Sequence, residues 1–165
     1  MMEKNFDKKC KKIKLVLSDI DGVLTDGGMY YSKDGEALKK FHTRDGIGIE
    51  LLLAKKIKTV LITREISRIN SARGKKLKID KILEGISDKR KELEKICKDY
   101  NVKDNEIAYI GDDINDLEIM KCVGFRCTPK DGALEIKKIA DYICKLEGGK
   151  GVFREMADLI IKYNK

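Results

Sequence analysis

Residues 13–24 read IKLVLSDIDGVL: a short apolar run ends on Asp19 and Asp21, and Gly22 follows them. A short apolar run bounded by a turn residue is typical of a buried strand. Side chains two positions apart on an extended chain point to the same side, so we expect both carboxylates to leave the end of this strand together. Neighbouring carboxylates repel each other unless a cation is supplied, and their oxygen atoms favour a hard cation such as Mg²⁺.

Two further apolar runs also end in polar residues. Residues 58–63 read KTVLIT and end at Thr63, and residues 106–113 read EIAYIGDD and end at Asp112 and Asp113. Apolar runs alternate with helical patterns, which predicts an α/β fold, a doubly wound parallel sheet with helices on both faces. Ligands bind at the carboxyl ends of the strands in such sheets, so we expect the three polar ends to meet at one edge.

The remaining elements are predicted from apolar periodicity and turn residues. Asp-Gly pairs predict a small β-hairpin flap over about residues 25–41, with its turn at residues 32–35 and His42 packed at its base. Asp45 and Ser87 are expected to cap the helices that follow them. Further strands are expected at residues 81–83, 123–127 and 141–144, and further helices at 65–77, 114–120 and 133–139, with a glycine-rich tail and final helix over 148–165.

Length and composition limit the possible classes of protein. The chain has 165 residues, 42% of them hydrophobic, and we expect one domain over residues 1–165. The net charge is +8, but no basic block is interleaved with aromatic residues, which argues against a nucleic-acid partner. No run approaches the ~20 apolar residues of a membrane span, and we expect no secretory signal and no membrane partner. Five cysteines without CxxC spacing argue against zinc and for reduced thiols in the cytoplasm.

Lys89 adds a cation to the three acidic or hydroxylic strand ends. It falls in the first turn of a predicted helix, where the helix dipole opposes a positive charge. Alone it would be read as one surface lysine among many, but beside the other groups it suits a phosphate ligand. Phosphoryl transfer is catalysed largely by positioning and charge stabilisation, and a carboxylate can serve as its nucleophile.

The stretches DIDGVLTDG, LITRE, the helix with Lys89 and GDDIND, in this order, resemble the four motifs of the haloacid dehalogenase superfamily of phosphatases. The resemblance implies that Asp19 is the nucleophile and that Asp21 is the general acid and then the general base. Thr63 and Lys89 would hold phosphoryl oxygens. Asp19, Asp112 and the backbone carbonyl of Asp21 would bind Mg²⁺.

The same resemblance leaves smaller roles to three residues of GDDIND. Asp113 and Asp116 would hold the metal through water or support its ligands, and Asn115 would help to start the helix. The spacing between the motifs leaves no room for a cap domain, so a large substrate or a neighbouring subunit would have to cover the site.

Four stretches, DIDGVLTDG, FHTRDGIGI, GDDIND and GGKGVFRE, resemble the capless phosphatases of 3-deoxy-D-manno-octulosonate (KDO) 8-phosphate. This resemblance implies a Mg²⁺-dependent homotetramer that hydrolyses a small anionic sugar phosphate. Its hairpins would meet at the centre, and the glycine-rich tail of one subunit would reach another's site. Arg44, Lys150 and Arg154 would contact substrate. Without the resemblance, Arg44 is a surface residue beside a helix cap, and Lys150 and Arg154 belong to a flexible glycine linker before the final helix.

The second motif departs from the octulosonate pattern, because it reads Thr63-Arg64-Glu65 where Thr-Gly-Arg is usual. Glu65, with Lys76 one helix later, resembles the phosphatases of nine-carbon sugar acids, so a 9-phosphate substrate is an alternative. A phosphorylatable receiver and a non-catalytic oligomeric scaffold remain as alternatives of another class. The intact set of charged residues argues against a scaffold, and the order of the motifs argues against a receiver.

Overall fold

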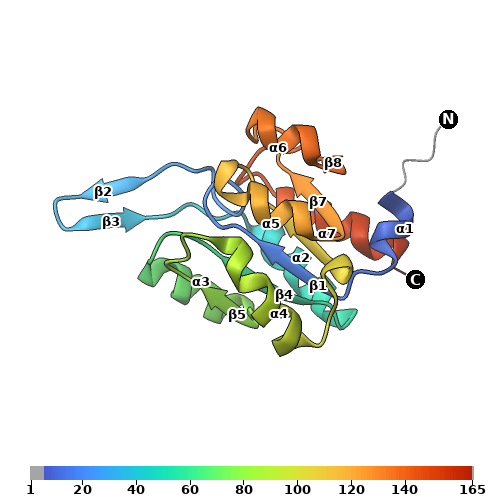
Figure 1. Cartoon of the computed structure of the whole chain (residues 1–165). Coiled ribbons are helices and arrows are strands. Elements are labelled where there is room, and N and C mark those ends of the chain that lie inside the picture. Colours follow the sequence, from blue (N-terminus) through green and yellow to red (C-terminus); the bar gives the residue numbers. More distant parts are fainter. Residues whose placement is uncertain (1–5, 165) are drawn as a thin grey trace.

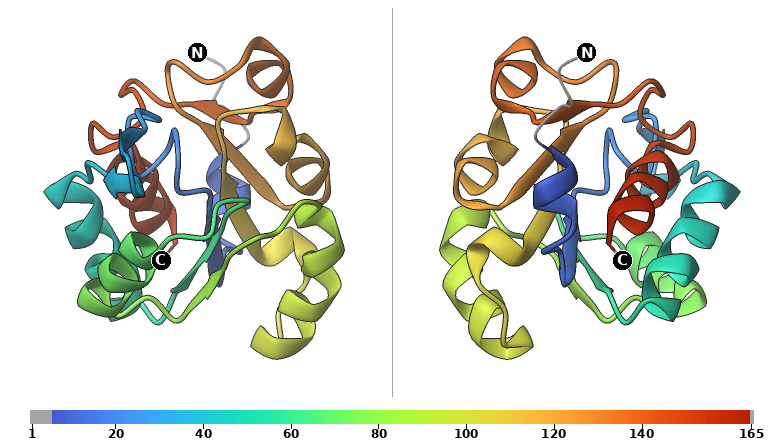
Figure 2. Two further views of the ribbon diagram at one scale, coloured as in Figure 1. Left: turned by 90° about the vertical axis from the view of Figure 1, so that its left-hand side faces the viewer. Right: turned by 90° about the vertical axis from the view of Figure 1, so that its right-hand side faces the viewer.

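A parallel sheet of six strands lies at the centre of the computed structural model, which describes residues 6–164 (Figures 1 and 2). Its strands lie in the order β5-β4-β1-β6-β7-β8, and each neighbouring pair is parallel. The chain therefore builds outward from β1 in one direction and then returns to build in the other. Their bounds are β1 (Leu15–Ser18), β4 (Lys58–Ile62), β5 (Lys81–Leu83), β6 (Ile107–Ile110), β7 (Phe125–Thr128) and β8 (Tyr142–Ile143).

Helices cover both faces of this sheet, as the end-on views of Figure 2 show. Alternate strand residues point to opposite faces, so Val16 packs in one apolar core while Leu15 and Leu17 pack in the other. The doubly wound prediction is confirmed. The helices of the first core are α1 (Phe6–Cys10), α2 (Thr43–Ala54), α3 (Arg68–Leu77) and α7 (Val152–Tyr163), and those of the second are α4 (Leu93–Tyr100), α5 (Leu117–Cys122) and α6 (Leu134–Ile139).

The predicted hairpin is also present, and it extends away from the sheet (Figure 1). Its strands β2 (Tyr30–Ser32) and β3 (Gly35–Leu38) are antiparallel, and a bridge between Thr25 and Phe41 closes its base. Within the described residues 6–164 this hairpin projects beyond the end of the sheet, and those residues contain no cap domain. None of the helices within 6–164 combines the length and the apolar character needed to cross a bilayer.

The cap predicted at Asp45 is wrong. Helix α2 begins at Thr43, because His42 is the N-cap and its Nδ1 accepts a hydrogen bond from the backbone N of Arg44 at 3.2 Å. Asp45 is buried in the first turn, where it accepts a hydrogen bond from the backbone N of Arg154 at 2.9 Å. It therefore caps α7, a helix far away in the sequence, instead of its own.

The segment around Lys89 also differs from the prediction. A short 3-10 helix, η1 (Lys89–Glu92), follows Asp88, and α4 starts only after it.

Helix α3 begins at Arg68, because Ser67 accepts a hydrogen bond from the backbone N of Ile69, so the expected start at residue 65 is wrong. Two other 3-10 turns, η2 (Asp104–Glu106) and η3 (Ile114–Asp116), flank β6.

Candidate active site

The carboxyl ends of β1, β4 and β6 meet at one small pocket of about 190 Å³. Ser18, the last residue of β1, lies beside Leu61 of β4 and Ile110 of β6, so the residues after these strands are neighbours. The predicted meeting of three polar strand ends is therefore present in the fold. The pocket is lined by Asp19, Asp21, Thr63, Arg64, Glu65, Asp112, Asp113 and Asn115.

Lys89 is buried beneath this pocket between two carboxylates. Its Nζ lies 2.8 Å from Oδ2 of Asp19 and 2.6 Å from Oδ1 of Asp116. Burial lowers the pKa of Lys89, but Asp116 and Asp19 outweigh burial and raise that pKa above its usual value. A buried charge without a partner is costly, so this arrangement fixes the Lys89 amine and the Asp19 carboxylate together. The alternative reading of Lys89 as a surface lysine is wrong.

Asp116 accepts hydrogen bonds on both of its oxygens. Its Oδ1 also accepts from the hydroxyl of Tyr109 at 2.6 Å, and its Oδ2 accepts from the backbone N of Asp112 at 3.0 Å. With Lys89 this makes three donors to one wholly buried carboxylate. Asp116 thus orients Lys89 and the backbone of Asp112. The sequence analysis did not identify Tyr109, because it lies in an apolar strand. The one signal that could have identified it is a polar hydroxyl group in a strand expected to be buried.

Carboxylates outnumber cations at this place. Oxygen atoms of Asp19, Asp112 and Asp116 all lie within 4.8 Å of one another. Burial raises the pKa of Asp19 to about 7, with the charge of Asp116 adding to the rise and Lys89 opposing it. Burial raises the pKa of Asp112 to about 8, and Asp19 and Asp116 add to it. Such an excess of oxygen ligands fits a divalent cation. Asp19 and Asp112 line the pocket whereas Asp116 is wholly buried behind it, so Asp19 and Asp112 are the side chains suited to hold the cation.

Gly22 allows the loop after β1 to lie against Asp112. Its φ is +83°, and a Cβ atom built there would lie 2.0 Å from Oδ2 of Asp112. The left-handed conformation favours glycine, and the close approach excludes any side chain. The glycine therefore brings Asp21 and Asp112 to the same pocket.

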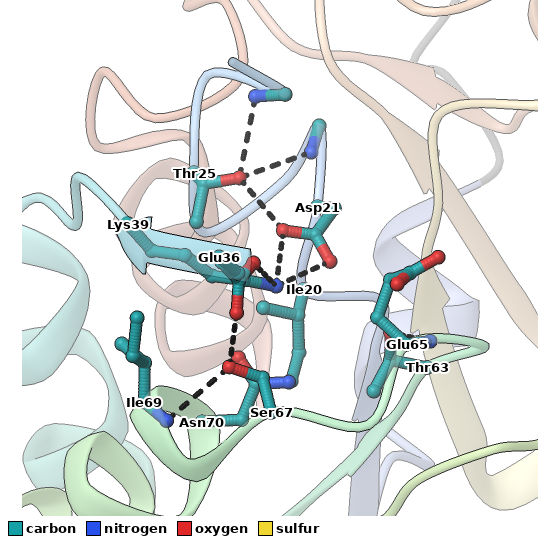
Figure 3. A network of polar contacts seen from close by, with 12 residues as sticks. Ile20, Asp21, Thr25, Glu36, Lys39, Thr63, Glu65, Ser67, Ile69 and Asn70 are labelled. Carbon is teal, nitrogen blue, oxygen red and sulfur yellow. Dashed lines mark hydrogen bonds and ion pairs between the residues drawn. The ribbon is translucent and has the colours of Figure 1, made fainter. Parts of the chain in front are cut away.

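Asp21 is held by groups of the hairpin and its base (Figure 3). Both of its carboxylate oxygens lie 2.8 Å from Nζ of Lys39, and its Oδ1 accepts from the hydroxyl of Thr25 at 3.3 Å. Sequence reasoning did not single out Lys39, since nothing distinguishes it in the sequence from its many neighbouring lysines.

The residues expected to bind substrate divide into two groups. Glu65 lines the pocket, whereas Lys76 is exposed in the last turn of α3, and Lys150 is exposed in the glycine-rich turn before α7. Arg44 and Arg154 line a separate cavity of about 560 Å³, and Nε of Arg154 is 2.7 Å from Asp158. Within one chain, only Glu65 of these five residues lines the pocket.

The remaining acidic residue of the group, Asp113, is exposed on the pocket rim and accepts a hydrogen bond from the backbone N of Ile114 at 2.7 Å. It caps the turn η3. Asn115 lies beside it, half-buried, in the same turn.

The doubly wound sheet, with clustered aspartates and a buried lysine at its switch point, defines an α/β protein with a site suited to a divalent cation and an anionic ligand. The chain belongs to the haloacid dehalogenase-like hydrolases, whose sequence pattern matches residues 51–156, and within them to the 3-deoxy-D-manno-octulosonate 8-phosphate phosphatase family. It is therefore a phosphatase. The enzyme of that name from Haemophilus influenzae is 37% identical over 155 residues, which cover 94% of this chain and 86% of the relative.

Solved structures support the same relationship. The 3-deoxy-D-manno-octulosonate 8-phosphate phosphatase of Moraxella catarrhalis, in complex with magnesium, phosphate and KDO, aligns with a TM-score of 0.94 at 34% identity, covering 98% of this chain and 92% of that one. A Vibrio cholerae structure described as a putative enzyme of the same kind aligns with a TM-score of 0.95 at 37% identity, covering 98% and 90%.

Proposed function

We propose that this chain is a Mg²⁺-dependent phosphomonoesterase that hydrolyses a 3-deoxy-2-keto sugar-acid phosphate of the KDO 8-phosphate type through an aspartyl phosphate. The observation that carries the proposal is the Asp19 carboxylate, held 2.8 Å from the buried amine of Lys89 at the edge where Thr63 and Asp112 also lie. The relatives named above supply the substrate class. Magnesium and KDO are bound in the Moraxella catarrhalis structure.

The reaction follows from what these side chains can do. Asp19 attacks phosphorus, the bond from phosphorus to the sugar oxygen breaks, and Asp21 gives its proton to that oxygen. Water then attacks phosphorus, Asp21 takes the proton of the water, and the bond to Asp19 breaks to release phosphate. Thr63 and Lys89 hold the phosphoryl oxygens throughout.

The cation site fits this reaction. Bound Mg²⁺, held by Asp19, Asp112 and the backbone carbonyl of Asp21, would offset the negative charges of the carboxylates and the phosphoryl group. Asp113 lies on the rim, where it would act through water. Asp116 supports the site through Lys89 and the backbone of Asp112.

The test is hydrolysis of eight- and nine-carbon keto-acid phosphates by the wild type and Asp19→Asn, with Mg²⁺ present and absent. We expect the wild type to turn over only with Mg²⁺ and Asp19→Asn to lose at least about 10³-fold in kcat, because the nucleophile is gone. Asp34→Asn, an exposed residue of the hairpin turn, is the matched control. A substantial residual rate in Asp19→Asn with an intact fold would exclude Asp19 as the nucleophile.

A nine-carbon sugar-acid 9-phosphate is the second candidate substrate, and the position of Glu65 in the pocket favours it. A carboxylate suits hydroxyl groups or an amine, whereas an arginine suits a substrate carboxylate. We expect Glu65→Arg to shift preference toward the eight-carbon substrate, and an unchanged ratio of kcat/KM values would count against this.

A phosphorylatable receiver is the alternative of another class, and rapid turnover of p-nitrophenyl phosphate by the wild type would exclude it.

The hairpin supports a further part of the proposal, a homotetramer. It exposes large apolar side chains, although a lone two-stranded hairpin is marginally stable in water. In the assembly Arg44, Lys150 and Arg154 would contact substrate bound to a neighbouring subunit. The large apolar side chains that the hairpin exposes, with their exposed fractions, are Met29 (54%), Tyr30 (45%), Tyr31 (63%) and Leu38 (65%).

Replacement of one of these apolar residues tests the assembly. We expect Leu38→Lys to lower the sedimentation coefficient to that of a smaller species, because a charge would be buried between hairpins. Leu134→Lys is the control, since Leu134 is 72% exposed on α6, away from the hairpin. Equal sedimentation of the wild type and Leu38→Lys would contradict assembly through the hairpin.

A further inference from the structure

Lys39 carries a buried amine out of the hairpin toward Asp21. Its side chain is only 3% exposed, and its Nζ lies 2.8 Å from both oxygens of Asp21 and 3.3 Å from Oε1 of Glu36. Ordering and burying a long lysine side chain is costly, and these two carboxylates offset the cost.

The same contacts continue from the hairpin into the body of the protein (Figure 3). Oε2 of Glu36 accepts a hydrogen bond from the hydroxyl of Ser67, the residue that caps α3. The backbone N of Ser67 in turn donates to Oε1 of Glu84 at 3.0 Å, beyond the end of β5. The base of the hairpin is thus attached to one side of the sheet at Ser67 and to the pocket at Asp21.

The neighbouring lysine shows that this placement is specific. Lys40 is 56% exposed and pairs with Asp26 at 3.2 Å, in the loop outside the pocket. Asp21 itself has a side chain that is 29% exposed, and the partners identified for it are Lys39 and Thr25. Of these two, Lys39 is the one that contacts both oxygens.

We propose that Lys39 is a positioning residue for the acid-base carboxylate of Asp21, and that the hairpin sets its place through Glu36. The inference rests on the proposed function, because it assigns Asp21 the two proton transfers. It adds a role for the hairpin beyond contact between subunits: a displaced hairpin would move Lys39 and release the carboxylate of Asp21.

Two substrates with different leaving groups separate this role from a general loss of structure. A sugar alkoxide must receive the proton of Asp21 when its bond to phosphorus breaks, but p-nitrophenolate leaves as an anion and needs none. In the second step, water attacks phosphorus and must give its proton to Asp21, whichever group has left. A misplaced Asp21 therefore slows both steps for a sugar phosphate, but only the second step for p-nitrophenyl phosphate.

The experiment compares Lys39→Met, Lys39→Arg and the control Lys40→Met, which removes the same charge one residue away. For Lys39→Met we expect kcat on the sugar phosphate to fall about 10- to 100-fold, with KM within about threefold of the wild type. With p-nitrophenyl phosphate in a stopped-flow experiment, we expect a burst near one equivalent per chain and a slow steady state. Lys39→Arg should recover much of the rate, and Lys40→Met should match the wild type.

The outcomes are distinguishable from a failure of the proposed function. A wild type that hydrolyses neither substrate would overturn the proposed function itself. An active wild type with a Lys39→Met variant that keeps its kcat, or loses it without a burst, would overturn the positioning role. If thermal unfolding shows that Lys39→Met does not fold, Glu36→Gln takes its place. We expect this variant to show a burst and an intermediate loss, and wild-type behaviour would overturn the inference.

Discussion

Asp116 illustrates how much of this site depends on one buried carboxylate. It accepts from the amine of Lys89, the hydroxyl of Tyr109 and the backbone N of Asp112. Its neighbour in sequence, Asp113, has the same side chain but is exposed and caps the turn η3. The two residues therefore differ in environment rather than in chemistry, and a buried ionised group that loses its charge leaves its partners unsatisfied.

Asp116→Asn and Asp113→Asn form a matched pair that tests this difference. We expect Asp116→Asn to lower kcat/KM about 10²-fold or more, because the buried amine of Lys89 would lose one of its two carboxylates and an amide has one acceptor oxygen in place of two for Lys89, Tyr109 and the backbone N of Asp112. The loss of kcat/KM in Asp113→Asn should be about ten times smaller than the loss in Asp116→Asn, because Asp113 is exposed. Steady-state kinetics with Mg²⁺ present provide the measurement. Equal losses in the two variants would show that the buried contacts of Asp116 carry no special weight.

At the scale of elements, the turn after β1 combines backbone strain with a close contact. Gly22→Ala would place a Cβ 2.0 Å from Oδ2 of Asp112, at a φ of +83°. Gly35→Ala in the hairpin turn carries similar strain, at a φ of +110°, but no atom lies within 4 Å of its Cβ. We expect backbone strain to cost both variants about 1–2 kcal/mol in the free energy of unfolding, and we expect Gly22→Ala to lose more because the carboxylate of Asp112 must move. Only Gly22→Ala should also lose activity, and a fully active Gly22→Ala would contradict the assigned place of Asp112.

The sequence predicted the elements whose signals are local. The apolar runs before Asp19, Thr63 and Asp112 identified the strands and the edge where they meet, because a parallel sheet gathers the ends of its strands. The cap at Asp45 was wrong, since a distant helix, α7, takes that carboxylate. Lys39 was missed for the same reason: its partner Asp21 lies 18 positions away and is reached only when the hairpin forms.

At the scale of the whole molecule, the strand order decides where the charges gather. The chain leaves β1 for β4 and β5 and returns to β6 on the other side of β1, so the switch point lies between β1 and β6. Asp19 follows the first of these strands and Asp112 the second, and the backbone N of Asp19 donates to the carbonyl of Ile110 at 3.0 Å. A chain with a net charge of +8 thus concentrates acidic groups where a ligand of this fold class binds.

This concentration of acidic groups predicts how stability depends on pH. Burial and neighbouring charges raise the pKa of Asp112 from 3.8 to about 8 in the metal-free protein. Between these values the folded state holds a proton that the unfolded state has released, so the free energy of unfolding falls as pH rises from 5 to 8. We expect a loss of about 2–3 kcal/mol across this range, allowing for partial solvent screening, since one pKa unit corresponds to about 1.4 kcal/mol.

Saturating Mg²⁺ should remove most of this loss, because a bound cation favours the ionised carboxylate and stabilises the folded state by about 2.7 kcal/mol at 100 times its Kd. Urea unfolding at pH 5 and pH 8, with EDTA or with Mg²⁺, measures both effects. Asp112→Asn is the control for other titrating groups: it should reduce the pH dependence of the metal-free protein to the part contributed by groups such as Asp19, whose pKa is raised to about 7, and it should abolish the gain from Mg²⁺. A metal-free wild type that is more stable at pH 8 than at pH 5, or that gains nothing from Mg²⁺ at pH 8, would contradict a cation site built on Asp19 and Asp112.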